Sequence, residues 1–214
     1  MKKILLLLLC FPFFLFAQDS QKRMKKKLDN QSKYETINIK DKIPAIETEL
    51  KSVKETWFSL ESMKAQNGLI VIFTCNTCPF VVMWEDRYKL IEKLARENNL
   101  GLAYVNSNYK KRDGDDSFEE MKKHAKKMQY SYPYLLDEKS RLANAFGAKT
   151  TPHIFLFNSA DELVYKGAID DNHKDINQVK RFYLKDAIKQ LTTGKTVFPS
   201  ETEPVGCSIK RYNP

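Results

Sequence analysis

Residues 69–79 of this 214-residue chain read LIVIFTCNTCP. The first six are apolar and rich in β-branched side chains, which predicts a buried strand. From Pro79 the apolar side chains recur every three or four residues as far as Leu94, which predicts a helix with a proline in its first turn. The stretch therefore predicts a strand that runs into a helix, with Cys75 and Cys78 at the junction.

Cys75 lies where the predicted strand ends. At a helix N-terminus the unpaired N–H groups and the positive end of the helix dipole favour an anion, so we expect an accessible Cys75 whose pKa is lowered. A fall from about 8.5 to about 7 corresponds to roughly 2 kcal/mol. Cys78, one helical turn further on, is expected to be buried. The spacing predicts a redox site in which Cys75 is the nucleophile and Cys78 the resolving thiol.

Two other interpretations of the cysteine pair are a zinc half-site and an inert structural disulfide. A structural zinc site needs four ligands, usually with a second pair of Cys or His at short spacing. The histidines His124, His153 and His173 are scattered along the chain, so we expect no metal site. A strand-to-helix junction is a poor place for a purely structural disulfide, but that alternative stays open.

The N-terminus has the order of a secretory signal peptide. Lys2 and Lys3 precede an apolar run at residues 4–16, and the small residue Ala17 follows it. The run is too short to span a bilayer comfortably as a permanent helix. We therefore predict a signal peptide at residues 1–17 and a bacterial protein that is periplasmic or secreted. An uncleaved N-terminal anchor is the alternative.

The rest of the chain is long enough for one domain with a sizeable core. Residues 18–34 are polar and basic, which predicts a flexible linker. The domain itself is predicted at residues 35–194. The remaining residues, 195–214, are expected to form a tail that packs back on the domain.

The chain carries a formal net charge of +9, from 36 Lys and Arg against 27 Asp and Glu. Basic runs lie at residues 21–27, 110–112 and 122–127. Nucleic-acid binding would require such charges interleaved with exposed aromatic side chains on one surface. That pattern is not evident, so we interpret the runs as solvated faces and predict no nucleic-acid partner.

Strand and helix patterns alternate along the domain. Ser117 and Glu120 have the spacing of a capping box, and Gly147 is placed to end a helix. The predicted strands are 34–39, 69–74, 100–105, 133–136, 153–157 and 163–168, and the predicted helices are 79–98, 117–128, 137–146 and 175–193. This order implies an α/β fold, a mixed sheet with helices on both faces.

Four segments carry a resemblance to known proteins. They are FTCNTCPFV at residues 73–81, TPHIFLF at 151–157, LVYKGAIDDN at 163–172 and GCSIK at 206–210. The chain resembles the thioredoxin superfamily, and within it the redoxin branch of alkyl-hydroperoxide-reductase-like and exported thioredoxin-like proteins. The resemblance covers roughly residues 35–210.

The resemblance implies a thioredoxin fold with a cis-proline, Pro152, opposite the cysteine pair. It also implies that Thr151 and Pro152 form a ledge whose backbone pairs with an extended substrate segment. An extra helix and strand at residues 116–136 are typical of redoxin-type members. This chemistry needs no cofactor.

The sequence departs from these relatives at two points. Peroxiredoxins place Thr or Ser three residues before the peroxidatic Cys, whereas here Ile72 precedes Cys75 and Cys75 precedes Cys78. This spacing disfavours peroxidase chemistry. Thioredoxins usually carry a buried acid in the redox strand, and residues 69–73 contain none. Glu85 is a candidate substitute, although we expect it on a solvated helix face.

We therefore predict a monomeric, exported thiol-disulfide oxidoreductase that acts on protein or small thiol and disulfide substrates and uses a redox donor. A thiol peroxidase and a non-catalytic binding module are the alternatives. Cleavage after Ala17 would leave Cys207 as the one cysteine outside the pair. We expect Cys207 to be an auxiliary thiol on the anchored tail. The competing interpretation makes it the resolving partner of Cys75, or a bridge between two chains.

Overall fold

The computed structural model describes residues 34–212. The predicted signal peptide at 1–17 lies outside these residues, as does the predicted linker except for its last residue. The chain divides into two units, Met1–Glu35 and Thr36–Pro214, and the fold given below is that of the second. Across the described part of the chain, no helix is both long enough and apolar enough to span a bilayer.

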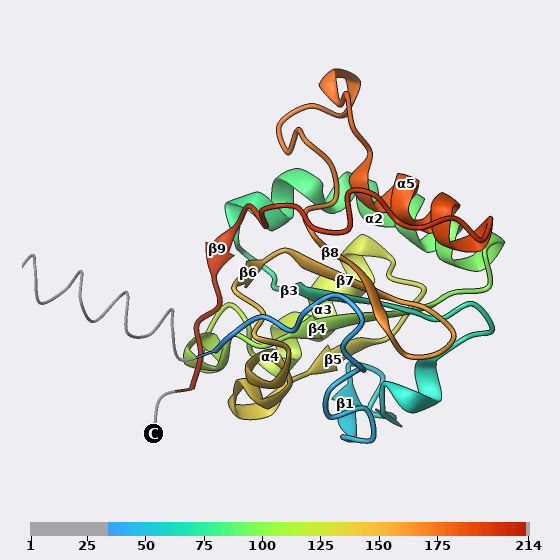
Figure 1. Ribbon diagram of the computed structural model, residues 1–214. Coiled ribbons are helices and arrows are strands. Elements are labelled where there is room, and N and C mark those ends of the chain that lie inside the picture. The colour runs from blue at the N-terminus through green and yellow to red at the C-terminus, as the bar shows by residue number, and fades with distance from the viewer. Residues whose placement is uncertain (1–33, 213–214) are drawn as a thin grey trace, which may run out of the picture. The chain divides into compact units, whose positions relative to one another are not determined.

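The second unit contains strands and helices in alternation (Figure 1). The strands are β1 (Leu50–Ser52), β2 (Trp57–Phe58), β3 (Leu69–Thr74), β4 (Gly101–Asn106), β5 (Tyr134–Leu136), β6 (Thr150–Thr151), β7 (His153–Phe157), β8 (Leu163–Gly167) and β9 (Cys207–Ser208). The α-helices are α2 (Pro79–Glu97), α3 (Phe118–Met128), α4 (Arg141–Phe146) and α5 (Tyr183–Thr192). Short 3-10 helices lie at Glu61–Met63, Tyr109–Lys111, Glu138–Ser140 and Ile176–Gln178.

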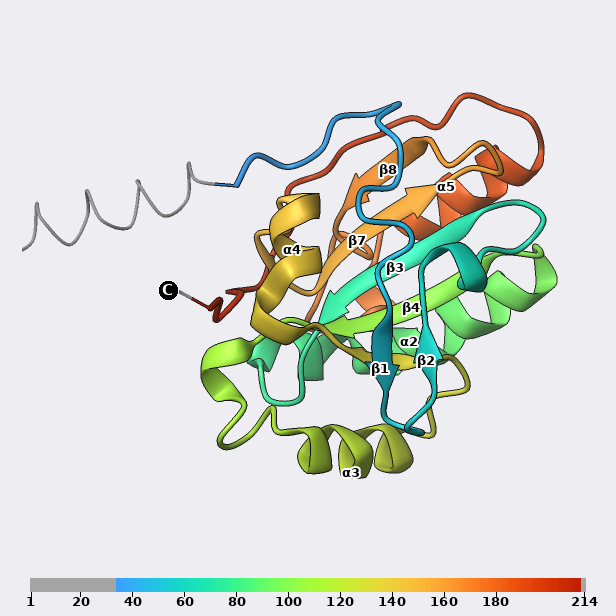
Figure 2. The same cartoon turned by 90° about the horizontal axis from the view of Figure 1, so that it is seen from below.

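Seven strands form one mixed sheet in the order β2-β1-β5-β4-β3-β7-β8 (Figure 2). β3 is an interior strand, parallel to β4 on one side and antiparallel to β7 on the other. β6 and β9 pair separately as a two-stranded antiparallel sheet. The predicted α/β thioredoxin fold is confirmed, and the cysteine motif follows an interior strand of the sheet.

The side chains of β3 pack alternately into two separate cores, because successive residues of a strand point to opposite faces of the sheet. Ile70 and Ile72 pack with apolar residues of α2, α3 and α5. Leu69, Val71 and Phe73 pack with α4 on the opposite face. Every residue of β3 is buried, as its apolar sequence predicts. The strand that leads to the cysteines is therefore held from both sides.

The helix ends follow the sequence signals. Pro79 occupies the first turn of α2. The side chain of Ser117 accepts a hydrogen bond from the N–H of Glu120 (3.3 Å) and caps α3. Gly147 ends α4 with φ of 58°, a left-handed conformation that glycine adopts at little cost.

The predicted early strand at 34–39 is not present. The N–H of Ile37 donates to Phe146 and the N–H of Lys40 donates to Leu163, so the backbone bonds of this segment go to two different elements. Ile37 and Ile39 pack against the core on the α4 face. The segment is therefore anchored by its side chains without forming a ladder. The first strands are instead the β1-β2 hairpin.

The last helix begins later than predicted. Asp175 caps only a 3-10 turn, accepting a hydrogen bond from the N–H of Asn177 (2.8 Å). Ile176 is 38 % exposed, and Val179 is extended. These residues lie outside the apolar core, so the helical pattern becomes α5 only where it packs against α2 and β8, from Tyr183 onward. α4 likewise begins after a 3-10 turn.

Candidate active site

The cysteine motif lies at the junction of β3 and α2, as the sequence predicts. β3 ends at Thr74, and Cys78 is the N-cap residue of α2 in an extended conformation (φ −65°, ψ 125°). Pro79 follows as the first helical residue. Cys78 rather than Cys75 therefore lies directly at the helix N-terminus, where unpaired N–H groups favour a thiolate.

Both cysteines of the pair are free thiols and both are buried. Cys75 is 1 % exposed and Cys78 is 6 % exposed. The expected burial of Cys78 is confirmed, whereas the expectation of an accessible Cys75 is wrong. The sulfur of Cys75 lies 3.3 Å from the hydroxyl oxygen of Thr151, and the neighbouring side chains of Asn76 and Asp116 are buried as well. Cys75 is thus enclosed between β6 and the loop that follows β4.

The Thr151-Pro152 peptide bond is cis, as predicted. Thr151 contacts both sulfurs, because its hydroxyl faces Cys75 and its carbonyl oxygen accepts a hydrogen bond from the Cys78 thiol (3.2 Å). The two segments meet because β3 and β7 are hydrogen-bonded neighbours, with Phe73 opposite His153. The tertiary structure therefore brings the four predicted site residues Cys75, Cys78, Thr151 and Pro152 together.

The C-terminal tail covers the ledge at Thr151. β9 pairs antiparallel with β6, with Cys207 opposite Thr151 and Ser208 opposite Thr150 (Figure 1). A Cβ atom added at Gly206 would lie 2.3 Å from the carbonyl oxygen of Thr151, so only glycine allows this close approach. The backbone at Thr151, which was expected to pair with an extended substrate segment, pairs in the structure with the chain's own tail.

Comparison with known proteins identifies the family. A family model described as Redoxin matches residues 38–181. The chain belongs to the redoxin family. Its members are thiol-based redox enzymes, either peroxidases or thiol oxidoreductases. No curated protein sequence matches the chain.

Solved structures similar to this redoxin include relatives of moderate identity. The crystal structure of an uncharacterized conserved protein from Geobacillus kaustophilus is 28 % identical with a TM-score of 0.75, over 83 % of this chain and 93 % of that chain. A putative thiol:disulfide interchange protein DsbE from Chlorobium tepidum is 16 % identical with a TM-score of 0.54, over 74 % and 98 %. A PrxQ mutant from Xylella fastidiosa is 17 % identical with a TM-score of 0.52, over 62 % and 86 %. The last two similarities show the shared fold alone.

In this redoxin the pKa of Cys78 is lowered and the pKa of Cys75 is raised, the reverse of the predicted order. The Cys75 thiol donates a hydrogen bond to the Cys78 sulfur, and the Cys207 thiol and N–H groups at the helix start add to this effect. The same bond to Cys78 raises the pKa of Cys75, with burial and the charge of Asp116. The carbonyl of Thr151 favours the Cys78 thiol, but the donors to the thiolate outnumber it.

We expect alkylation of the fully reduced protein to show this order. Cys78 should react with iodoacetamide along a titration whose midpoint lies below the ordinary thiol value of about 8.5, and Cys75 and Cys207 with midpoints above it. Below its midpoint Cys78 takes up a proton and its reaction slows. Peptide mapping after timed alkylation from pH 4 to pH 10 measures each site. A Cys75 midpoint below that of Cys78 would contradict this order.

A buried polar network that the sequence did not point to supports the motif. Asp116 is 1 % exposed, and its carboxylate accepts hydrogen bonds from the N–H of Asn76 (2.9 Å) and the amide groups of Asn106 and Asn108 (2.8 and 3.0 Å). The hydroxyl of Tyr134 donates to the Asn76 side chain (2.9 Å). Asn106 ends β4, Asn108 and Asp116 follow it, and Asn76 follows the carboxyl end of the parallel neighbour β3. Their position could have been noticed in the sequence, because binding and catalytic sites often lie at the carboxyl ends of parallel strands.

Glu85 is buried, so the expectation of a solvated helix residue is wrong. It is 7 % exposed, and its carboxylate lies 2.5 Å from Nε2 of His124 and accepts a hydrogen bond from the hydroxyl of Tyr130 (3.3 Å). Among the described residues no hydrogen bond joins Glu85 to either sulfur of the pair. It ties α2 to α3 and does not serve directly as the proton acceptor of Cys78.

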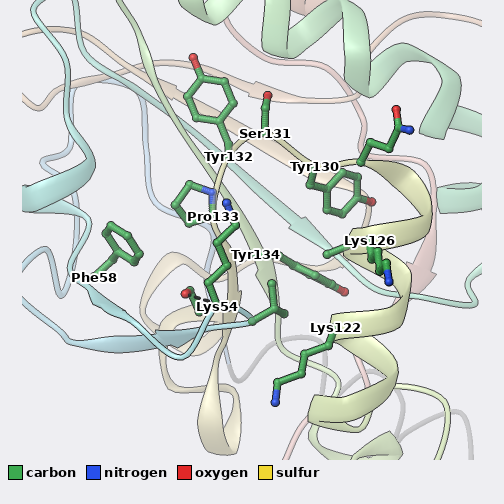
Figure 3. A pocket seen from close by; sticks show the side chains of 13 residues that line it. Lys54, Phe58, Lys122, Lys126, Tyr130, Ser131, Tyr132, Pro133 and Tyr134 are labelled. Carbon is green, nitrogen blue, oxygen red and sulfur yellow. Dashed lines mark hydrogen bonds between the residues drawn. The ribbon is translucent and has the colours of Figure 1, made fainter.

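Two hollows lie near the motif. An open groove of about 750 Å³ begins at Asn76 and Thr77 and continues along α3 past Glu120, Lys123 and Lys127. A second pocket of about 390 Å³ lies between α3 and β5 and contains none of the cysteines (Figure 3). Within residues 34–212 no group of three or more His, Cys, Asp or Glu side chains is arranged to hold a metal ion. Neither Cys75 nor Cys78 lines either hollow, and the groove meets the motif at Asn76 and Thr77.

Proposed function

We propose that this redoxin is a thiol-disulfide oxidoreductase in which Cys78 makes the first attack and Cys75 is the resolving thiol. The observation that carries the proposal is the geometry of the thiol pair: Cys78 is the N-cap of α2, and both sulfurs are held against Thr151. Both cysteines keep the catalytic role expected of them, but their order is reversed, because the helix begins after Cys78 and not after Cys75. Substrates are protein or small disulfides, and the chain's own sulfurs carry the chemistry without a cofactor.

The reaction proceeds in two exchanges. The Cys78 thiolate attacks one sulfur of a substrate disulfide; a bond forms between Cys78 and that sulfur, and the other substrate sulfur leaves and takes up a proton. Cys75 then loses its proton and attacks Cys78, which forms the Cys75-Cys78 disulfide and releases the second substrate thiol. The substrate gains two electrons, which the protein thiols lose. Run in reverse, the same steps oxidise a dithiol.

The coupling between the two thiols sets the order of these steps. The largest cause of the raised pKa of Cys75 is its hydrogen bond to the Cys78 sulfur. Once Cys78 is part of a mixed disulfide it carries no charge, so that cause disappears and the pKa of Cys75 falls. Cys75 therefore becomes a nucleophile only after Cys78 has captured a substrate.

Export is part of the proposal. It is supported by the charge, apolar run and small residue at positions 1–17. An exported compartment also suits disulfide chemistry, because thiols in the cytosol are kept reduced. N-terminal sequencing of the protein from the periplasm or culture medium tests this: a chain starting after Ala17 is expected, and an intact Met1 in a cytosolic fraction would contradict it.

Equilibration of the wild-type protein with defined ratios of reduced to oxidised dithiothreitol or glutathione tests the activity. We expect a reversible Cys75-Cys78 couple between about −270 and −180 mV. A couple below about −300 mV would indicate an inert disulfide and a binding module instead. In a parallel assay, rapid consumption of hydrogen peroxide with slow turnover of disulfides would favour the peroxidase alternative.

A further inference from the structure

β9 lies on β6 in the way that an extended peptide adds to the edge of a sheet. The pairing is antiparallel, and it sets Cys207 directly opposite Thr151, the residue whose carbonyl oxygen contacts Cys78. Peptide ligands that bind by strand addition use this same backbone pairing. The tail therefore presents a cysteine at the place where a substrate strand would present its disulfide.

The side chain of Cys207 reaches the redox pair. It is partly buried against the cluster formed by Cys75, Cys78 and Val81. Its thiol lies within hydrogen-bonding reach of the Cys78 sulfur, and its N–H also points at that sulfur. Cys78 is thus the central sulfur of three, with Cys75 on one side and Cys207 on the other.

The tail is held in place on both sides of Cys207. Upstream, the N–H of Thr202 donates to the carbonyl of Lys166 on β8 (3.0 Å). Downstream, Ile209 is 7 % exposed, packs into the core on the α4 face, and donates its N–H to the carbonyl of Lys149 (3.2 Å). Such tethering gives Cys207 a high effective concentration at Cys78, on the order of millimolar or above.

We propose that Cys207 is a third redox-active cysteine of this site and that β9 is its tethered internal substrate. The proposal rests on the function proposed above. The Cys207 thiolate attacks the sulfur of Cys78 in the oxidised Cys75-Cys78 pair. The Cys78-Cys207 bond forms as the Cys75-Cys78 bond breaks, and Cys75 leaves and takes up the proton that Cys207 released. The exchange moves a disulfide without net oxidation.

This exchange gives the oxidised protein two forms. With the Cys75-Cys78 bond, β9 is held by noncovalent contacts alone, and an incoming disulfide can compete with it for Thr151. With the Cys78-Cys207 bond, β9 is locked onto the ledge and Cys78 is withdrawn from substrates. Cys207 is then neither the merely auxiliary thiol that the sequence predicted nor a partner of Cys75.

The full-length Cys75→Ser variant, reduced and then treated with oxidised glutathione, tests the proposal. The Cys78 thiolate should attack glutathione disulfide and release one glutathione; Cys207 should then attack Cys78 and release the second. We expect a monomeric Cys78-Cys207 bridge by non-reducing peptide mapping, with no glutathione retained. The Cys75→Ser/Cys207→Ser double variant should keep the glutathione on Cys78.

A matched control moves the tail thiol by one residue. In Cys75→Ser/Cys207→Ser/Ser208→Cys the sulfur lies on the opposite face of β9, because alternate strand residues point to opposite faces. We expect at least about tenfold less bridge than in Cys75→Ser. Equal bridging in the two variants would overturn the proposal, because it would show random capture by a flexible tail.

Mapping of the oxidised wild-type protein separates this inference from the proposed function. Cys75-Cys78 and Cys78-Cys207 bridges in exchange with one another support it. A Cys75-Cys78 bridge alone, in a protein that still exchanges external disulfides, would overturn the inference and leave the function standing. A Cys75-Cys207 bridge or a covalent dimer would also overturn it. A fully reduced protein that is inert toward external disulfides would overturn the proposed function, whichever bridge it forms on oxidation.

Discussion

The Cys78→Ser variant is expected to lose disulfide-exchange activity by at least about 1,000-fold. Cys78 is the N-cap of α2, and it accepts hydrogen bonds from both neighbouring thiols, so it holds the thiolate on which the first attack depends. A serine hydroxyl stays protonated at neutral pH and is a poor nucleophile toward sulfur. The initial rate of reduction of a protein disulfide, with dithiothreitol as donor, measures the loss.

The Cys75→Ser variant is the matched control, since it removes the other thiol of the pair. Its Cys78 should still attack, and it should accumulate products that it cannot resolve through Cys75: mixed disulfides with the substrate, or the bridge to Cys207. Multiple turnover should be low in both variants, but only Cys75→Ser should give Cys78-linked species on non-reducing gels. Capture of the substrate by Cys78→Ser through Cys75 would reverse the roles assigned to the two sulfurs.

The second large effect concerns stability. The Asp170→Ala variant is expected to lower the free energy of unfolding by about 3 to 5 kcal/mol. The Asp170 carboxylate accepts hydrogen bonds from the indole of Trp84 (2.8 Å) and the guanidinium of Arg87 (3.2 Å), both on α2. The side chains of Asp170 and Arg87 are only 1 % and 3 % exposed. Removing the carboxylate leaves a buried charge without its buried partner.

Asp86→Ala provides the control, because Asp86 pairs with the same arginine from the surface. Its side chain is 55 % exposed and lies 2.5 Å from the Arg87 guanidinium. An exposed ion pair contributes little, so the expected loss is under about 1 kcal/mol. Urea unfolding of the reduced proteins, with comparable slopes, measures both. Similar losses in the free energy of unfolding for the two variants would show that burial of the Arg87-Asp170 pair does not determine its contribution to stability.

Most of the fold could be predicted because its signals are local. The apolar run at 69–74 and the helical spacing after Pro79 each describe one element, and the structure has both. The prediction from helical spacing was wrong where a segment had no neighbouring element to pack against. Residues 176–179 continue the helical spacing but lie outside the core, so they form a 3-10 turn and an extended residue instead.

The pair of cysteines was also visible in the sequence, but their chemical order was not. A thiol's acidity depends on the charges and donors around it. For Cys75 these include Asp116, which comes from a different part of the chain and was not singled out. For Cys78 they include the exact start of α2, which periodicity does not define to within one turn.

By itself the sequence determined an α/β chain with two cysteines at a strand-to-helix junction, because those features depend on residue type and short spacing. The redoxin type and the proline opposite the cysteines were implied by the resemblance to known proteins. Only the tertiary structure decided that Cys78 lies at the helix N-terminus, that Asp116 lies beside Cys75, and that β9 covers Thr151 with Cys207 next to Cys78. These contacts join residues distant in the chain, and their energies come from burial and proximity, which no local pattern encodes.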